Sequence, residues 1–474
     1  MIAQHFINGA WSDIGDRIAV EDPGTGEPIG EVVLADPTCV DKAVVAADAC
    51  ARGGDLTRSR PAYRLSLMLQ MAAAIRAVTE EGAEVLCRES GKPLRDARGE
   101  FEEAARYFEY YGGMADKLEG RSIPLGEDYF DWTMREPHGV SAHIVPWNFP
   151  VGIAARSLAA GLAAGNCVVL KSPELTPLAL CILVKALAST DLPAGAINLI
   201  SGDGAMTGAA LVRHPLVQHI VFTGSVPTGR AILRAAAERI VPCVMELGGK
   251  SAAVVHADAD IDTVVASVES GVFFNAGQVC SAMARLIVHE SLHDRLADAI
   301  AARAEALEIG HGLDDPDLSA LISGPQLERV EQHCAGAIAE GAKALTGGQR
   351  VMRAGYFMQP TVFTEVAPSM RVANDEIFGP AISLMPFSDS AQAIALANGT
   401  DYGLVAGVFG QDINRTLDTA RQLEAGQVFV NEWFAGGVET PFGGTGQSGY
   451  GREKGLEALD NHLRTRNIAV RLNR

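Results

Sequence analysis

The stretch His219-Ile220-Val221-Phe222-Thr223-Gly224-Ser225 joins a short apolar run to a turn, and a segment with helical character, 229–237, follows it. A strand, a tight turn and a helix in this order would aim Ser225 and a helix N-terminus at a phosphate. Three further β-rich runs alternate with helical stretches, and they cover 142–145, 167–170 and 196–200. The alternation predicts a parallel sheet with helices on both faces, although a fold alone does not define a function.

A second alternating block starts at 251–255 and continues through a helical run over 261–274. A strand-like run over 285–288 and an amphipathic stretch over 292–307 complete it. This block predicts a second α/β domain.

The rest of the chain differs from these blocks. The first hundred residues are expected to be mostly helical, with periodic apolar positions over 63–78 and an acidic, aromatic helix near 101–111. Two short segments, 129–134 and 467–472, stand apart from both blocks. Isolated two-faced strands of this kind are candidates for sheet pairing between subunits.

Composition restricts the classes of protein to consider. The chain has 474 residues, enough for about three domains, and 39 basic against 58 acidic residues give a net charge of −19. Such a charge argues against binding to nucleic acid. Eight cysteines without a Cys-x-x-Cys pair favour a reducing compartment, so a cytoplasmic location is expected. Neither a secretory signal nor an apolar run long enough to span a membrane is apparent.

Two residues offer reactive chemistry. Cys280 follows Gly277-Gln278-Val279, a turn that could expose its sulfur near backbone N–H groups, which lower a thiol pKa and bind an oxyanion. Glu246 ends the apolar run 241–245, where partial desolvation would suit it to act as a general base. Each has a structural alternative: a cysteine is usually a small core residue, and a carboxylate at a strand end is often simply solvated.

The segment 146–150 contains two prolines, two aromatic residues and Asn148 in a rigid turn after a strand. The Asn148 side chain could donate a hydrogen bond to an oxyanion, and a plain turn is the alternative. A second loop, Gly202-Asp203-Gly204, lacks the strict G-x-G-x-x-G spacing, so neither it nor the Ser225 turn is a specific phosphate signal alone.

One literal motif suggests a different enzyme. His289-Glu290-Ser291-Leu292-His293 matches the zinc-protease pattern H-E-x-x-H, which needs both histidines on one face of a single helix. His289 follows a strand-like run and Ser291 resembles a helix N-cap, so we expect the histidines on different elements. No other His, Cys or acidic cluster has metal-ligand spacing, and no metal is expected.

Taken together, these segments resemble the aldehyde dehydrogenase superfamily over essentially the whole chain. Seven motifs match in order, and they cover 146–150, 171–174, 222–225, 246–250, 277–280, 376–380 and 441–444. The resemblance implies a Rossmann-like NAD-binding domain, an α/β catalytic domain and a small β oligomerisation flap. The implied boundaries are 1–118 and 138–247 for the first, with 448–462 packing back on it, 248–447 for the second, and 119–137 with 463–474 for the flap. A homodimer or homotetramer is expected.

The resemblance also implies a non-acylating NAD(P)-dependent reaction that oxidises an aldehyde to a carboxylic acid. Cys280 would attack the aldehyde, and Asn148 with the Cys280 backbone N–H would hold the oxyanion. Hydride transfer to NAD would leave a thioester, which water activated by Glu246 would hydrolyse. The residues that would contact or line the cofactor site are Ile144, Val145, Trp147, Lys171, Glu174, Gly204, Gly224, Ser225, Thr228, Leu247, Glu376 and Phe378. Glu174 beside the ribose 2′-hydroxyl would favour NAD over NADP.

The substrate is less defined by these motifs. Arg156 matches a wall of the family's substrate tunnel, where an arginine is similar to both semialdehyde and aromatic-aldehyde enzymes. The semialdehyde pattern expects a second arginine six positions before the nucleophile, but this chain has Phe274 there. With Phe149, Trp433 and Phe434 expected nearby, an aromatic or medium-chain aldehyde is at least as well supported, and a surface ion pair is the structural alternative for Arg156.

Three rival classes remain open at this point. A thiol hydrolase would use Cys280 and Glu246 on esters without redox chemistry, but the cofactor motifs would then have no role. A zinc protease would rest on the His289 motif alone. A catalytically silent structural protein would not explain why Cys280, Glu246 and Asn148 are all present.

Overall fold

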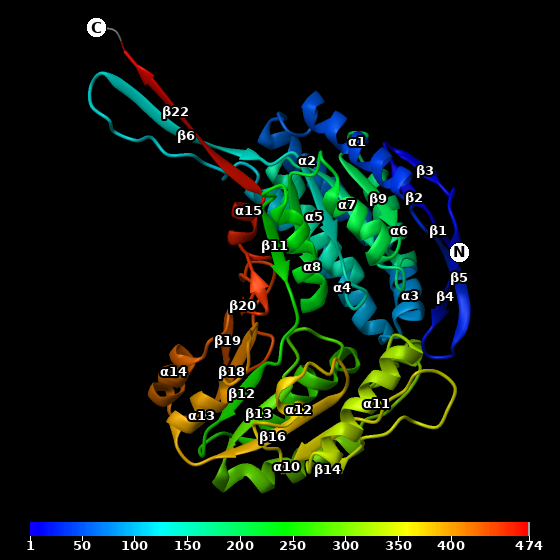
Figure 1. Ribbon diagram of the computed structural model, residues 1–474, viewed down its shortest axis with the longest axis vertical. Coiled ribbons are helices and arrows are strands. Elements are labelled where there is room, and N and C mark those ends of the chain that lie inside the picture. Colours follow the sequence, from blue (N-terminus) through cyan, green and yellow to red (C-terminus); the bar gives the residue numbers. More distant parts are fainter. Residues whose placement is uncertain (473–474) are drawn as a thin grey trace.

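The computed structural model describes residues 1–472, so the last two residues of the predicted flap segment 463–474 lie outside the described residues. The chain forms two lobes, each built around its own sheet, and a two-stranded arm projects from the first lobe (Figure 1).

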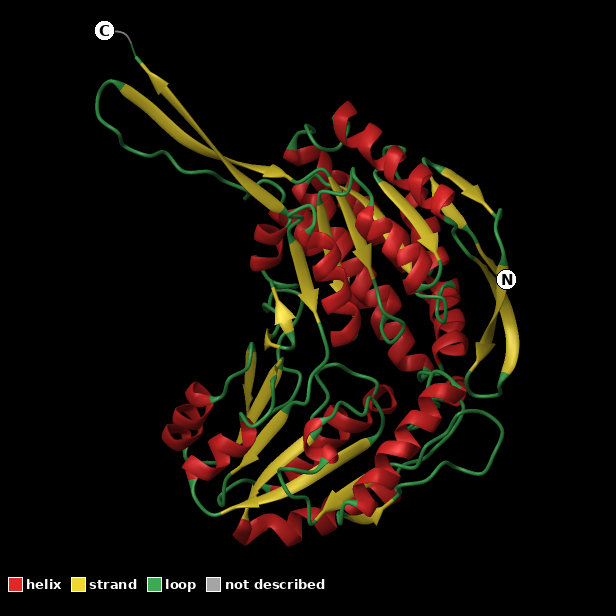
Figure 2. Ribbon diagram, in the orientation of Figure 1, coloured by secondary structure: helices red, strands yellow, loops and turns green. Residues whose placement is uncertain are grey.

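The sheet of the first lobe has eight strands in the order β21-β11-β10-β7-β8-β9-β2-β3. Its five central strands are parallel, and every residue of β7 to β10 is buried because helices cover both faces (Figure 2). The predicted runs near 142, 167, 196 and 219 are therefore confirmed as strands. The bounds are β7 Val140–Ile144, β8 Cys167–Ser172, β9 Ile197–Ser201, β10 His219–Thr223, β11 Cys243–Glu246, β2 His5–Ile7, β3 Ala10–Ser12 and β21 Gly449–Tyr450.

Helices of the first lobe begin where the sequence supplies caps or prolines. Pro150 opens the fully buried helix α5, and the Ser225 side chain accepts a hydrogen bond from the Thr228 N–H at the start of α8. The helices are α1 Pro37–Gly53, α2 Pro61–Ala77, α3 Thr79–Ser90, α4 Leu94–Met114, α5 Pro150–Ala164, α6 Leu178–Ala188, α7 Ala209–Arg213, α8 Val226–Ala237 and α15 Glu457–Asn461.

The N-terminal segment differs in part from the prediction. Helices α2 and α4 confirm the helical patterns over 63–78 and 101–111, but residues 2–33 form five short strands that the sequence pattern did not indicate. Three of them, β1 Ile2–Ala3, β4 Arg17–Asp22 and β5 Glu27–Val33, make a separate small sheet. These strands depend on pairing partners rather than on their own periodicity, because Phe6 in β2 pairs with the distant Leu199 in β9.

The second lobe contains a seven-stranded sheet in the order β14-β15-β16-β13-β12-β18-β19, parallel except for β14. The predicted helical run over 261–274 is shorter than expected, since α9 ends at Val268 and irregular helical turns follow. The strands are β12 Ala252–Val255, β13 Arg285–His289, β14 Lys343–Thr346, β15 Thr361–Thr364, β16 Ala381–Phe387, β18 Val405–Phe409 and β19 Gln427–Val430. The helices are α9 Ile261–Val268, α10 Glu290–Glu305, α11 Gly324–Ala339, α12 Arg371–Asn374, α13 Ser390–Ala397 and α14 Ile413–Gln422, and a short ladder pairs β17 Tyr402–Gly403 with β20 Thr445–Gly446.

The arm consists of β6 Tyr129–Pro137 and β22 Leu463–Arg471, which pair antiparallel along their whole length. It confirms both isolated strand-like segments of the sequence. Large apolar side chains on it are exposed, among them Phe130 at 63% and Val470 at 40%. Within residues 1–472, no helix has the length and apolar character needed to cross a membrane.

Candidate active site

The segment before Cys280 has an unusual backbone. Asn275, Ala276 and Gly277 have φ values of +48°, +53° and +73°, so three consecutive residues lie in the left-handed region. A Cβ at Gly277 would collide with the Gly379 carbonyl oxygen, which explains the glycine there. Strained backbone of this kind persists only where surrounding contacts hold it, and it is frequent at functional sites.

Three hydrogen bonds hold this segment to the turn after β7 and to the second lobe, and a fourth lies within the segment. The Gln278 side chain donates to Asn275 O at 3.1 Å and accepts from the Ile322 N–H at 2.9 Å. The Asn148 side-chain amide donates to Gln278 O at 2.9 Å, and Asn275 donates to Asn148 O at 3.2 Å. The predicted oxyanion donor Asn148 is thus tied directly to the loop that carries Cys280.

A buried ion pair holds the turn that carries Asn148. Lys92 and Glu100 form a salt bridge with both side chains at most 3% exposed. Lys92 also donates to Asn148 O at 2.9 Å, while Glu100 accepts from the Val151 and Gly152 N–H groups at 2.9 Å each. The pair therefore fixes both the turn that presents Asn148 and the first turn of α5.

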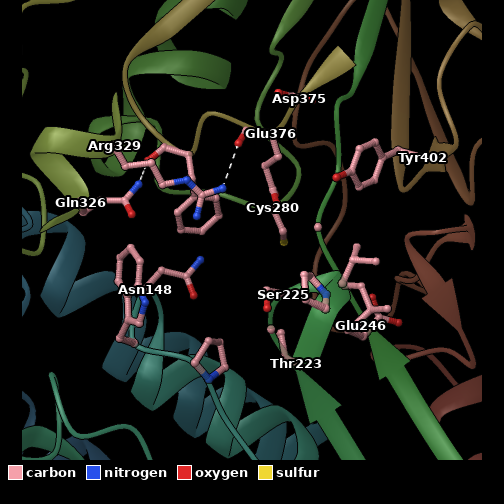
Figure 3. A pocket seen from close by; sticks show the side chains of 18 of the residues that line it. Asn148, Thr223, Ser225, Glu246, Cys280, Gln326, Arg329, Asp375, Glu376 and Tyr402 are labelled. Carbon is pink, nitrogen blue, oxygen red and sulfur yellow. Dashed lines mark hydrogen bonds between the residues drawn. The ribbon is translucent and has the colours of Figure 1, made fainter. Parts of the chain in front are cut away.

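Cys280 lines two cavities. The first has a volume of about 550 Å³ and includes Asn148, Ser225, Glu246 and Glu376 in its lining. Figure 3 shows the Cys280 thiol pointing into this cavity, with Asn148 on one side and Glu246 on the other. The second has a volume of about 380 Å³, and its lining includes Cys280 and six aromatic residues. Cys280 therefore belongs to the linings of two spaces that could each hold a molecule.

Burial raises the pKa of the Cys280 thiol to about 12, with nearby Glu246 and Glu376 acting in the same direction and Arg156 opposing them. The sulfur is therefore a neutral thiol in the free protein at pH 7. A positive charge placed in the first cavity would favour the thiolate, which is the nucleophilic form.

Glu246 ends β11 and reaches the same cavity. Burial and the neighbouring Glu453 carboxylate raise the pKa of Glu246 well above its usual range, while Arg156 and Arg452 lower it in part. Both of its carboxylate oxygens are buried without a hydrogen-bond partner. The raised proton affinity of this carboxyl group is a property that a general base requires.

Part of the predicted cofactor set lines the first cavity, namely Trp147, Gly224, Ser225, Leu247, Glu376 and Phe378. Glu376 accepts a hydrogen bond from the Gly249 N–H at 3.1 Å, and the Phe378 ring meets Trp147 edge-on at 5.3 Å. The other predicted positions, outside this lining, are Ile144, Val145, Lys171, Glu174, Gly204 and Thr228. Among these, Lys171 near the end of β8 and Glu174 in the following loop form an ion pair at 3.4 Å.

The predicted substrate residues are divided between cavity and core. Phe149, Arg156, Phe274 and Phe434 line the second cavity. Trp433 does not, because it is buried in the core of the second lobe and donates to Ser281 O at 3.2 Å. It supports the segment after Cys280 and offers no surface to this cavity.

The sequence left two alternatives for Arg156, a wall residue of the substrate tunnel and a surface ion pair, and the structure matches each of them only in part. It forms an ion pair with Glu453, as the structural alternative proposed, but both partners are buried rather than on a helix surface. The guanidinium also lines the second cavity, and its Nε has no hydrogen-bond partner.

The two histidines of the zinc-protease motif lie on different elements, as expected. His289 ends β13 and His293 lies inside α10, so the two histidines belong to different elements. The predicted N-cap was wrong by two positions: His289, not Ser291, caps α10 and accepts from the Ser291 N–H at 3.2 Å.

Sequence reasoning missed several residues of the site. Lys92, Glu100 and Glu453 were not predicted, because nothing local in the sequence indicates that these charges are buried. The segment Gly451-Arg452-Glu453 lies a few residues after the motif 441–444. This nearness is the one sequence signal that could have indicated Glu453. Other unpredicted lining residues of the first cavity are Thr223, Gln326, Arg329, Arg371, Asp375 and Tyr402.

The Aldehyde dehydrogenase family model matches residues 11–468. The chain belongs to the aldehyde dehydrogenase family. It is similar to a betaine aldehyde dehydrogenase of Cereibacter sphaeroides, with 37% identity covering 99% of this chain and 97% of the relative. A mitochondrial benzaldehyde dehydrogenase of Antirrhinum majus is 38% identical, covering 98% of this chain and 88% of the relative.

Solved structures agree with this aldehyde dehydrogenase assignment. The NAD⁺ complex of an aldehyde dehydrogenase from Bacillus cereus superposes with a TM-score of 0.98 at 35% identity, covering 100% of this chain and 97% of that one. The aldehyde dehydrogenase fold expected from the seven motifs is thereby confirmed.

Proposed function

We propose that this aldehyde dehydrogenase oxidises an aldehyde to the carboxylic acid with NAD⁺, by way of a thiohemiacetal and a thioester on Cys280. The observation that carries the proposal is that Cys280 lines both cavities. One can hold a cofactor and the other an aldehyde, so that the reacting carbon lies next to both.

The residues of the site have separate tasks in this reaction. Cys280 gives its thiol proton to water in the first cavity, and the thiolate attacks the carbonyl carbon. The Asn148 amide with the Cys280 N–H stabilises the oxygen that becomes negative. NAD⁺, when bound, accepts the hydride that the carbon loses. Glu246 then takes a proton from water, the water oxygen attacks the thioester carbon, and the carbon–sulfur bond breaks to release the acid.

The first cavity fits a dinucleotide at its nicotinamide end. The N-terminus of α8 with Ser225 offers N–H groups to a pyrophosphate, and Glu376 offers a carboxylate to a ribose. Lys171 and Glu174 are proposed to meet the adenosine ribose. Glu174 would repel a 2′-phosphate, so NAD⁺ should be preferred, and a kcat/KM equal or higher with NADP⁺ would contradict this.

The charges around the second cavity favour an uncharged aldehyde. Its lining contains two cationic side chains, Arg156 and Lys454, and each is already paired with a carboxylate, Glu453 and Glu103 respectively. Glu100 and Glu103 also line it and are paired in turn with Lys92 and Lys454, so the lining offers a substrate carboxylate no unpaired cation. The walls are aromatic, and they include Tyr107, Phe149, Phe274, Phe429, Phe434 and Phe442. An aromatic aldehyde is therefore our proposed substrate class.

The two-step chemistry is tested with Glu246→Gln. This variant should still reduce about one NAD⁺ per chain in a rapid burst, while steady-state turnover falls about 10²–10⁴-fold because the thioester persists. Cys280→Ala is the matched control and should give no burst. Ester cleavage by the wild-type chain without any NAD⁺ reduction on adding aldehyde would favour the hydrolase alternative.

The exposed apolar arm supports a homo-oligomer in which β6 and β22 pack against a second copy. We also propose the domain boundaries and the flap that the family resemblance implies. The two large sheets and the separate β6–β22 pair support this division of the chain. A cytoplasmic location stays a prediction from cysteine usage.

A further inference from the structure

Three buried histidines lie together in the first lobe, outside both cavities. His143 lies in β7, His219 in β10, and His462 between α15 and β22. Their exposed fractions are 0%, 1% and 3%, and one ring nitrogen of each lies within 4.8 Å of the others. The proposed reaction gives none of them a role.

Strand register explains why the first two rings meet. His219 lies opposite Ser141 on the neighbouring parallel strand, and His143 is two residues further along, so all three side chains project from the same face. Helix α15 packs on α5 and brings the third ring. The Asn166 side chain fixes that segment by donating to His462 O at 2.9 Å.

The hydrogen bonding around the rings is incomplete. Ser141 Oγ lies 2.9 Å from His143 Nε2 and 2.8 Å from His219 Nδ1, so one hydroxyl orients two rings. The Nδ1 atoms of His143 and His462 are buried and have no partner. Buried polar atoms without partners are rare, because each loses its hydration without compensation. Two of them belong to rings of this one cluster, and a ligand bound among the three rings could satisfy them.

All three rings are in the chemical form that binds metals. Burial lowers the pKa of His143 and His219 well below the usual range and lowers that of His462 to about 3. Each neutral imidazole keeps a proton on one nitrogen and offers the lone pair of the other. Ser141 supplies the outer hydrogen bonds that commonly orient metal-bound imidazoles.

We propose that His143, His219 and His462 bind a first-row transition-metal ion such as Zn²⁺ at the root of the arm. Neutral imidazoles suit Zn, Cu, Ni and Fe, and three of them leave a fourth position for water. Zinc–nitrogen bonds of about 2.1 Å place the nitrogens about 3.4 Å apart, so the rings must close by a little over 1 Å. The sequence shows no ligand spacing because the three residues are far apart along the chain.

The ion would have a structural role. His462 immediately precedes β22, so a metal bond to it ties the C-terminal strand of the arm to β7 and β10 in the sheet. Binding to the folded chain alone raises stability by mass action, so added Zn²⁺ should raise the Tm.

The test uses the full chain with Cys280→Ala, so that the catalytic thiol is not a competing ligand. After incubation with Zn²⁺ and gel filtration, elemental analysis should find about one ion per chain. Co²⁺ should give the visible absorption of a tetrahedral site without a thiolate charge-transfer band. An ion-free protein, or a cobalt spectrum with that band, would overturn the proposal.

Variants then locate the ion. In the same Cys280→Ala background, His143→Gln and His462→Asn should each weaken Zn²⁺ binding more than about tenfold. His256→Gln is the control, since His256 is a buried histidine of the second lobe that bonds Thr419; it should bind as before. Equal binding by all variants would overturn the assignment. Should the cluster variants fail to fold, the cobalt spectrum of the parent still decides.

Discussion

Burial keeps Cys280 a neutral thiol in the free enzyme, and in the proposed reaction this protects a nucleophile that is needed only when both partners are bound. Its pKa is about 12 because the sulfur is desolvated and two carboxylates lie nearby. The proposed cofactor would place its positive nicotinamide ring in the first cavity, and this charge would lower the pKa of Cys280. At the same scale, Glu246 keeps its proton affinity through burial and through Glu453.

A pH profile of thiol alkylation checks this arrangement. A folded-state pKa raised to about 12 leaves roughly 10⁻⁴ of Cys280 as thiolate at pH 8. The iodoacetamide rate of the free enzyme should therefore rise about tenfold per pH unit up to pH 10 without a plateau, and saturating NAD⁺ should shift the profile to lower pH. Cys280→Ala corrects for the other thiols. A plateau near pH 8 in the free enzyme would disprove the raised pKa.

The Arg156 pairing gives a prediction about substrate choice. Because Glu453 already neutralises Arg156, the wild type should prefer benzaldehyde over succinic semialdehyde by at least about tenfold in kcat/KM. Arg156→Met should lower kcat/KM for both aldehydes to a similar extent, since it leaves Glu453 buried and unpaired beside Glu246. A selective loss with the semialdehyde would instead assign Arg156 to a substrate carboxylate.

At the scale of elements, the site depends on where helices and strands end. β7 leads into the turn with Asn148, β11 ends at Glu246, and the left-handed turn after α9 presents Cys280. The sequence pattern predicted these strands and the turn chemistry well, since apolar runs and glycine positions are local. It could not predict the supports, because the burial of Lys92 and Glu100 depends on α4 packing against α5.

Lys92→Met tests this support. Losing the hydrogen bond to Asn148 O should lower kcat about 10–100-fold with little change in KM for NAD⁺, because the oxyanion donor shifts. Removing one partner of a buried pair also destabilises by about 3–5 kcal/mol, so Tm must be recorded. The double variant Lys92→Met/Glu100→Gln, which removes the unpaired charge, should recover Tm but not kcat. Recovery of kcat would mean a purely structural role. Lys117→Met, at an exposed lysine, is the control.

At the scale of the whole molecule, the arm exposes apolar surface that a monomer would leave in contact with water. Its two strands have exposed apolar side chains and extend away from the rest of the chain (Figure 1). Phe130 and Val470 face each other across the two strands.

The arm prediction uses that pair. Phe130→Lys with Val470→Glu keeps a favourable cross-strand pair but removes the apolar surface. Light scattering after gel filtration should show a smaller assembly than the wild type forms. Met352→Lys, which changes an apolar residue that is 90% exposed in the second lobe, should leave the assembly unchanged. An unaltered mass for the double variant would exclude the arm as the interface.

The sequence by itself determined the reaction class and the two α/β blocks, because motifs, apolar periodicity and turn glycines are properties of short stretches. Only the tertiary structure decided what surrounds them: the Arg156–Glu453 pair, the core position of Trp433, the five N-terminal strands and the three-histidine cluster. Each of these depends on segments distant in sequence becoming neighbours, and burial of a charge or an imidazole is set by those neighbours. The chemistry proposed for Cys280 and Glu246 could therefore be predicted from short motifs, whereas the surroundings that bear on the proposed substrate class depend on how distant segments pack around them.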